Sequence, residues 1–280
     1  MPSAPPSLAH ALTRLWNRLR ATVAPVPDIS STLWLQTLGR YPFLAALPLH
    51  DQAKLRALSA LFLQHKEFTG AHGLVVTDAM AVAIAAQACL PLLHFGEPRQ
   101  ALAWYDDFVG IVVQPGDAVA RRRAVDEAGV VHDYTEVLMG EAMERGPVML
   151  SWQAVSEAGH SAARGANVVV HEFVHKLDMR NGSADGYPPL PPGFLGAKSA
   201  RAARDAWRAA WAPAYEAFRE RVIVAERFGG EPPWLDAYGA TAPAEFFAVA
   251  CEAYFVNRAR FGQEFPALLS VLDAFFRRTE

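Results

Sequence analysis

Cysteine is scarce in this chain of 280 residues, which contains only Cys89 and Cys251. A small secreted domain held together by disulfides would carry more cysteines, so the count favours a reducing compartment. Neither cysteine has a second ligand at the spacing of a metal site. The N-terminal segment, residues 1–27, also lacks the uninterrupted apolar stretch of a signal peptide. Together these absences predict a cytoplasmic protein.

Long apolar runs and an excess of one charge are missing as well. The most apolar segment, residues 79–93, contains Gln87 and is too short to cross a bilayer, so we expect no transmembrane segment. The formal net charge is −3, whereas proteins that bind nucleic acid directly usually present a basic surface. Hydrophobic residues make up 52% and charged residues 20% of the chain, which is the composition of a folded domain and not of a disordered one.

The pattern along the chain predicts a single α+β domain over residues 31–280, without internal repeats. Helices are expected from hydrophobic periodicity at 51–68, 77–95 and 198–224, and near Thr241–Pro243. Strands are expected in three short segments rich in β-branched or aromatic residues: Leu74–Val76, Phe108–Val113 and Pro147–Trp152. A proline-rich loop, 182–196, separates two of the helical regions and is either a lid or a plain connector.

An N-terminal arm, residues 1–30, precedes this domain. It contains a short amphipathic pattern in which apolar residues recur at three- and four-residue steps, namely Leu8, Leu12, Leu15, Trp16 and Leu19. Such a helix either packs on its own domain or binds a membrane surface or a partner.

One short motif indicates a metal-binding and catalytic site: His171, Glu172 and His175 in the run HEFVH. On a helix, residues four apart lie on one face, so both imidazoles can reach one metal ion at roughly 2.0–2.1 Å. The glutamate between them lies beside the metal, where it can deprotonate a bound water. The alternative is that both are ordinary histidines on a solvated helix face.

The helix that this motif needs conflicts with local propensity, because Val168, Val169 and Val170 favour a strand. Asn167 can cap a helix that begins after it. We expect a helix, since on a strand the two imidazoles would lie too far apart to share a metal.

A catalytic zinc site needs a third protein ligand. Asp178 returns to the same helix face, but it is better placed as an acceptor for an imidazole N–H than as a ligand. Glu245 and Glu252 are the remaining candidates, seven residues apart on an apolar helix that begins at Pro243. Burying a carboxylate there is costly unless it is paired, and the pairing group is either the metal or an arginine.

Three segments together give the chain a specific resemblance. GPVMLSW (Gly146–Trp152), HEFVHKLDMRNG (His171–Gly182) and DAYGATAPAEFFAV (Asp236–Val249) resemble the Mlc titration factor family, bacterial zinc metallopeptidases of the gluzincin type. Weaker similarity extends from about residue 40 to about Phe276. The N-terminal arm has no counterpart that we recognise in the family.

The resemblance implies a zincin-like fold, in which a small sheet lies over the active-site helix with further N- and C-terminal helices. It also implies one Zn²⁺ per chain, with His171, His175 and Glu245 as ligands and Glu172 as the catalytic base. Tyr238 matches a tyrosine near the metal and either stabilises the oxyanion or is a structural phenol. The strand Val148–Trp152 would then be the edge that binds an extended peptide substrate.

Metal-assisted hydrolysis of a peptide bond is therefore the function that we expect, with aminopeptidase activity on small apolar N-terminal residues as the family's association. A second hypothesis is a binding module that sequesters a transcriptional repressor resembling Mlc, using the N-terminal arm or the run Arg121–Arg123. That run is otherwise a solvated face. A purely structural zinc site is a third hypothesis, but it would leave Glu172 without a role.

Overall fold

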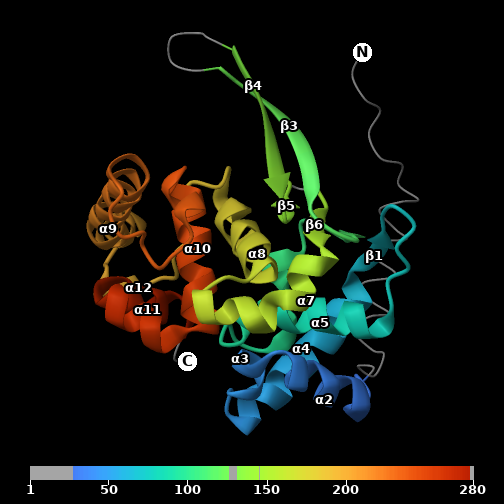
Figure 1. Ribbon diagram of the computed structural model, residues 1–280. Coiled ribbons are helices and arrows are strands. Elements are labelled where there is room, and N and C mark those ends of the chain that lie inside the picture. The colour runs from blue at the N-terminus through green and yellow to red at the C-terminus, as the bar shows by residue number, and fades with distance from the viewer. Residues whose placement is uncertain (1–27, 126–130, 145, 278–280) are drawn as a thin grey trace, which may run out of the picture.

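The computed structural model describes residues 28–125, 131–144 and 146–277 and consists mostly of helices around a small sheet (Figure 1). The α-helices are α2 (Ser31–Arg40), α3 (Pro42–Ala45), α4 (Leu49–His65), α5 (Asp78–Cys89), α6 (Pro98–Leu102), α7 (Trp152–Ser161), α8 (Val168–Asp178), α9 (Ala200–Phe228), α10 (Pro243–Val256), α11 (Arg258–Glu264) and α12 (Pro266–Phe276). The expectation of a mixed α+β fold is confirmed, as are the helices predicted near 51–68, 77–95, 198–224 and Pro243.

Within the described residues, six strands form one sheet and one separate ribbon. They are β1 (Glu67–Gly70), β2 (Gly110–Gln114), β3 (Ala118–Val125), β4 (Val131–Leu138), β5 (Gly140–Ala142) and β6 (Val148–Ser151). The sheet has the order β1-β2-β6-β5, in which β5 runs antiparallel to β6 and the other neighbours are parallel. β3 and β4 pair with each other as an antiparallel ribbon that rises from the body of the molecule (Figure 1).

The strand predicted at Leu74–Val76 is wrong. Those residues are loop, and the strand of this region is β1, which begins two residues after α4 ends. The chain turns sharply after β1, with positive φ angles at His72 and Gly73. At Gly70 an added Cβ would lie 1.8 Å from the Leu74 carbonyl oxygen, so the turn requires a glycine there.

The prediction that β6 is the edge of the sheet is also wrong. β6 lies between β2 and β5, and both of its sides are hydrogen-bonded. The strand at this edge is β5, whose sequence Gly-Glu-Ala contains no β-branched residue and gave no strand signal. β5 packs beside α8, so the edge lies next to the predicted metal-binding helix.

Helix α8 forms despite its three valines because its capping and its burial both favour it. The Asn167 side chain accepts a hydrogen bond from the Val170 backbone N–H at 2.9 Å and so caps the first turn, as predicted. Val169 and Val170 are fully buried. The Phe173 ring contacts those of Phe62 and Tyr105. Tertiary packing therefore overrides the strand propensity of the valines.

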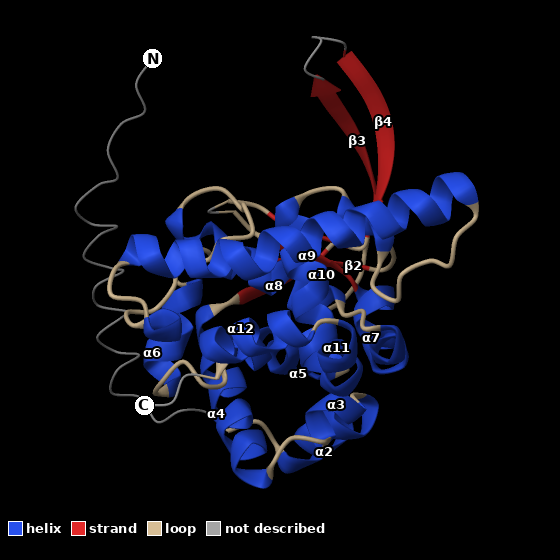
Figure 2. Cartoon of the chain, turned by 90° about the vertical axis from the view of Figure 1, so that its left-hand side faces the viewer, coloured by secondary structure: helices blue, strands red, loops and turns tan. Residues whose placement is uncertain are grey.

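The C-terminal helices enclose the other side of α8. α10 packs directly against α8, and the long helix α9 runs across the outside of this layer (Figure 2). Trp207 and Trp211 of α9 stack on each other and pack against Phe247 of α10. α10 is thereby held between α8 and α9.

Two buried lysines donate hydrogen bonds to backbone carbonyl oxygens of loops next to the sheet. Lys66 donates hydrogen bonds to the carbonyl oxygens of Tyr105 and Phe108, and burial lowers its pKa to about 8. Lys176 of α8 donates to the carbonyl oxygens of Met143 and Gly146, at 2.5 and 2.9 Å, in the turn between β5 and β6. Helix α8 is thus hydrogen-bonded directly to the turn that follows the edge strand β5.

Residues 1–27 of the N-terminal arm, which contain its predicted amphipathic helix, lie outside the described residues. None of the helices in the described part of the chain combines the length and the apolar character needed to cross a membrane.

Candidate metal centre

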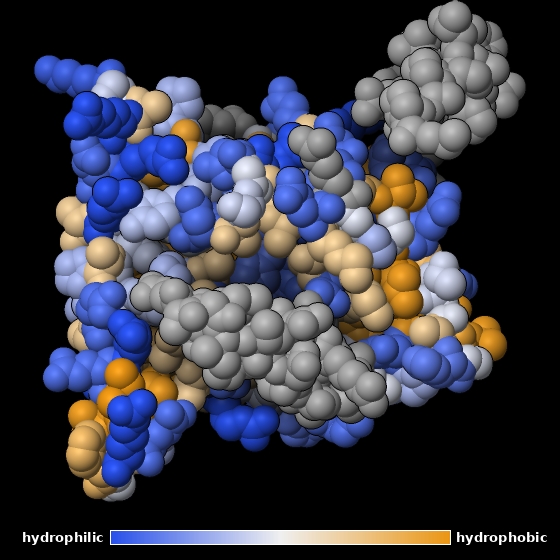
Figure 3. All heavy atoms as spheres, turned by 90° about the horizontal axis from the view of Figure 1, so that it is seen from above, coloured by the Kyte–Doolittle hydropathy of each residue, from blue (hydrophilic) through white to orange (hydrophobic). Residues whose placement is uncertain are grey.

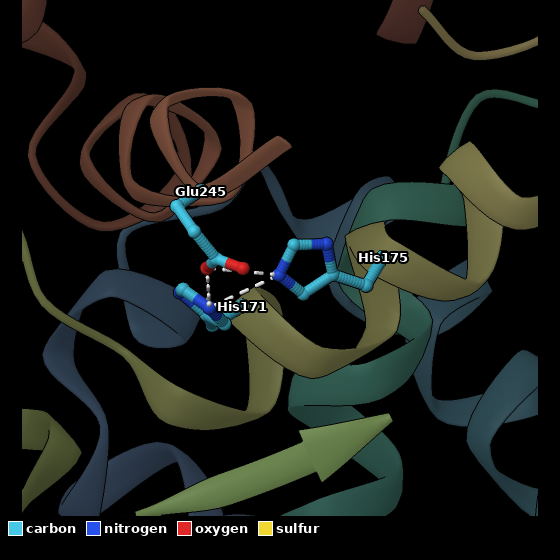
Figure 4. Close-up of side chains that lie close together, drawn as sticks. All are labelled: His171, His175 and Glu245. Carbon is cyan, nitrogen blue, oxygen red and sulfur yellow. Dashed lines mark hydrogen bonds and ion pairs between the residues drawn. The ribbon is translucent and has the colours of Figure 1, made fainter. Parts of the chain in front are cut away.

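His171 and His175 lie one turn apart on α8 and point to the same place. Their Nε2 atoms are 3.2 Å apart, and their ring centroids are 4.8 Å apart (Figure 4). His175 is buried, and the His171 side chain is 13% exposed. The prediction that a helix brings both imidazoles to one point is therefore confirmed.

Glu245 reaches the same point from α10. Its Oε2 atom lies 3.1 Å from His171 Nε2 and 3.3 Å from His175 Nε2 (Figure 4). Glu245 belongs to the first turn of α10, which Pro243 begins, as the sequence indicated. Its partners are the two histidines rather than an arginine.

The donor set and its spacing fit a metal ion. Three ligand atoms at about 2.1 Å in a tetrahedral arrangement are about 3.4 Å apart, close to the observed 3.1–3.3 Å. Two imidazole nitrogens and one carboxylate oxygen thus converge on one point, as the ligands of a zinc ion do. Among the described residues this is the one group of three or more such side chains close enough to hold a metal ion.

The charges of the cluster also favour a cation. Burial raises the pKa of the Glu245 carboxyl, but hydrogen bonds and charges from His171 and His175 outweigh burial and hold that pKa well below its usual range. Glu245 is therefore ionised, and it brings a negative charge to two nitrogen ligands.

Glu252, about two helical turns further along α10, does not join the cluster of His171, His175 and Glu245. Its Oε1 atom lies 2.8 Å from His171 Nδ1, and its Oε2 accepts a hydrogen bond from the Asn167 backbone N–H. The arginine salt bridge considered for this residue is wrong. A carboxylate at Nδ1 keeps the proton on that nitrogen and leaves the Nε2 lone pair free for a metal.

Glu252 belongs to a buried polar chain. Asn167 donates from its side-chain Nδ2 to Gln87 Oε1 of α5 at 2.8 Å, and Gln87 in turn donates to the Ala83 carbonyl oxygen. Gln87 and Asn167 are 0% and 1% exposed. The orientation of His171 is therefore fixed by groups from α5, α8 and α10 together.

Asp178 does not have the predicted role. Its Oδ2 accepts a hydrogen bond from the Gly186 backbone N–H at 2.7 Å, and its Oδ1 has no hydrogen-bond partner among the described residues. The Nδ1 atom of His175 likewise has none in this part of the chain. Through this hydrogen bond, Asp178 instead connects the end of α8 to the first part of the proline-rich loop.

Glu172 is buried beside the cluster, with 5% of its surface exposed. Burial raises the pKa of its carboxyl, while the nearby His171 and His175 lower it, and the net direction is upward. Gly140 of β5 faces this side chain so closely that an added Cβ would lie 2.5 Å from Glu172 Oε1. A carboxylate with a raised pKa next to a metal-binding cluster is typical of a general base.

A cleft of about 500 Å³ opens beside His171 and Glu172. The face from which the β3–β4 ribbon rises is hollowed near its middle (Figure 3). The cleft is lined by residues of several elements, among them Met139, Val168, Trp234, Tyr238 and Val249.

The ring centroid of Tyr238 is 6.1 Å from that of His171, so the structure brings this residue beside the cluster of His171, His175 and Glu245, as predicted. The sequence gave no signal for Met139, Gly140 or Trp234, because their places depend on the tertiary fold.

The comparison with known proteins agrees with a metallopeptidase centre. The sequence profile of the glucose-regulated metallo-peptidase M90 family matches residues 13–277, and the chain belongs to this family. Membership in a metallopeptidase family implies that the protein uses a metal ion, and the donor set described above fits one.

The curated relatives carry a common name. The chain is 33% identical over 248 residues to Mlc titration factor A of Salmonella arizonae, covering 88% of this chain and 90% of that protein. It is 34% identical over 238 residues to the protein of the same name from Edwardsiella ictaluri, covering 85% and 84% of the two chains. With the Serratia proteamaculans protein it shares 34% identity over 246 residues, covering 88% and 86%. The resemblance inferred from the three motifs is therefore confirmed.

Proposed function

We propose that the protein is a zinc-dependent peptidase with a zincin-like fold, in which His171, His175 and Glu245 hold one Zn²⁺ per chain. The convergence of these three ligand atoms at 3.1–3.3 Å carries the proposal. Glu172, buried beside them and next to an open cleft, supplies the general base. A structural zinc site would have no use for this carboxylate or for the cleft.

The chemistry divides between the metal and the chain. Zinc, when bound, polarises a carbonyl group and lowers the pKa of water to about 7. Glu172 takes a proton from the attacking water and passes it to the leaving amine. The Tyr238 hydroxyl donates a hydrogen bond to the oxyanion that develops on the substrate carbonyl.

The substrate is a peptide, bound as an extended strand along β5. β5 is an edge strand, and Gly140 places its backbone directly beside Glu172. The cleft offers apolar contacts from Met139, Trp234 and Val249. We propose aminopeptidase activity on small apolar N-terminal residues, as the family resemblance implies, and a cytoplasmic location.

The Glu172→Gln variant tests this function. The amide keeps the size of the side chain but cannot accept the proton, so we expect normal zinc content and a loss of turnover of about 10²–10⁴-fold. Zinc is measured by metal analysis, and turnover with alanine- and leucine-nitroanilide, before and after chelation. Normal turnover by this variant at full zinc occupancy contradicts the mechanism.

The relatives' name, Mlc titration factor A, suggests that those proteins bind a repressor. The second hypothesis for this chain rests on that name. The N-terminal arm lies outside the described residues, and for Arg121–Arg123 the structure gives only the backbone of β3. No contact among the described residues favours a repressor surface, so peptidase activity is the function that we put forward.

A further inference from the structure

The edge of the catalytic sheet continues far beyond the metal centre. β4 ends at Leu138, β5 begins at Gly140, and one residue, Met139, joins them. The Met139 carbonyl oxygen accepts a hydrogen bond from the Ser151 backbone N–H at 2.7 Å. Met139, which connects β4 to β5, is therefore itself hydrogen-bonded to β6. β4 and β5 therefore form one nearly continuous strand, which descends along the ribbon to the metal centre (Figure 1).

The open edges of β4 and β5 lie on the same side. β3 follows β2 along the chain, and β6 is inserted between β2 and β5. β4 pairs with β3, and β5 pairs with β6, so both use the side that faces β2 and β3. Among the described strands, none pairs with the opposite side of either. At β5, the strand packs against α8.

We propose that this continuous edge, Val131–Ala142, is an extended binding site for the polypeptide substrate, and that the β4 part is an exosite outside the catalytic cleft. The inference rests on the proposed peptidase function. The occupant is an unfolded peptide segment, because an open strand edge offers alternating backbone N–H and C=O groups to any extended chain. Continuity with the cleft argues for the substrate: Met139 and Gly140 line the cleft, and Gly140 touches Glu172.

The direction of the strand predicts which part of the substrate binds the ribbon. The chain runs from β4 down to β5, and antiparallel pairing is the more stable arrangement. A peptide that pairs antiparallel with β5 across the catalytic site continues upward with its C-terminal part along β4. The eight residues of β4 extend over about 26 Å at roughly 3.3 Å per residue. Residues on the C-terminal side of the cleaved bond therefore contribute binding energy well away from the metal.

Peptide length and a shortened ribbon test the proposal. Val119 and Val137 are paired in the ribbon, so replacing residues 120–136 by Asn-Gly joins them through a two-residue hairpin turn. Two peptide series share the same N-terminal residues and cleavable bond and are extended by equal lengths on the C-terminal side. One extension consists of neutral residues that can pair as a strand, and the other consists of prolines, which lack the backbone N–H that pairing needs. In the full chain we expect kcat/KM to rise at least about tenfold with the extension that can pair. The proline extension of the same length has no comparable effect.

In the shortened variant the benefit of C-terminal extension disappears, while turnover of the short nitroanilides and zinc content stay unchanged. These two measurements are also the control for correct folding. The same length dependence in the shortened variant overturns the exosite, as does an equal benefit from the proline extension.

A binding measurement separates this inference from the proposed function. Fluorescence anisotropy of labelled peptides with the Glu172→Gln chain, with and without the shortened ribbon, needs no turnover. If the full-length ribbon binds the C-terminally extended peptide more tightly and the shortened ribbon does not, the exosite holds even where hydrolysis fails. Equal affinity in both chains rejects it.

Discussion

Glu245 and Glu252 are seven residues apart on one helix, yet they have different partners. Glu245 meets the Nε2 atoms of both histidines, whereas Glu252 meets His171 Nδ1 and the Asn167 backbone N–H. The Glu245 carboxylate faces the proposed metal position, whereas the Glu252 carboxylate is hydrogen-bonded to Nδ1 on the opposite side of the His171 ring. Both are charged groups in an apolar helix, and each is stabilised by its histidine.

Substitution of the two glutamates should separate these roles. Glu245→Ala removes one of three ligands, so we expect the purified variant to contain no zinc. Glu252→Ala keeps all three ligands and retains zinc, but it binds zinc about 10–100-fold more weakly, because the His171 ring loses its support. Metal analysis and chelator competition measure both effects. Glu157→Ala, which removes a different carboxylate of the same cleft, is the control and should bind zinc like the unaltered protein.

The sequence predicted that His171 and His175 meet on one helix face, whereas the choice of Glu245 over Glu252 came from the family resemblance, and the partner of Glu252 was not predicted. The spacing of HEFVH and Pro243 indicated two helices and the face that each carboxylate occupies. Which group lies opposite a helix face depends on packing between α8 and α10, and the local pattern does not contain that information. Asp178 illustrates the limit: it has the right spacing on α8, yet it binds the Gly186 N–H.

At the scale of elements, helices were predicted more successfully than strands. Asn167 and Pro243 are local signals of helix starts, and both helices begin where these residues indicate. β5 and β1 have only three and four residues, and they are strands because neighbouring strands pair with them. Leu74–Val76 has strong strand propensity but lies beyond the turn at Gly70, where it does not join the sheet. Local strand propensity therefore gave wrong predictions where pairing with neighbouring strands determines whether a segment is a strand.

The close approach of β5 to α8 yields a prediction at this scale. Gly140→Ala adds a Cβ within 2.5–2.8 Å of three Glu172 atoms, so the strand or the general base must shift. Because a misplacement of about 1 Å can cost about 10²-fold in rate, we expect a loss of that order with zinc content unchanged. Gly116→Ala is a matched control at the rim of the same region, since its nearest neighbour, Gln153 Oε1, lies 3.6 Å from the added Cβ. Equal activity of the two variants contradicts the close-contact argument.

At the scale of the whole molecule, the metal centre joins two parts of the chain that are distant in sequence. His175 and Glu245 are separated by 70 residues, and α9 packs on the outside of the helix that carries Glu245. A ligand that binds only the folded chain stabilises it by mass action. The centre should therefore contribute to global stability as well as to chemistry.

Zinc is expected to raise the melting temperature. At a free concentration about 100 times its Kd, zinc adds about 2.7 kcal/mol to the free energy of unfolding, or about 5–10 °C for a chain of this size. Differential scanning calorimetry with and without a chelator measures the shift. Glu245→Ala should show no such dependence. A melting temperature of the unaltered protein that is insensitive to zinc contradicts the assignment of the three ligands.

The position of Glu245 in α10 also has a consequence during protein synthesis. A ribosome that has just completed α8 has already made His171, Glu172 and His175, but not the third ligand, which follows only after the 29 residues of α9. A growing chain, or one that terminates early before Pro243, thus contains Glu172 and the two histidines but lacks Glu245. Under the proposed function, the order of elements along the chain therefore delays a complete ligand set until most of the surrounding fold has been synthesised.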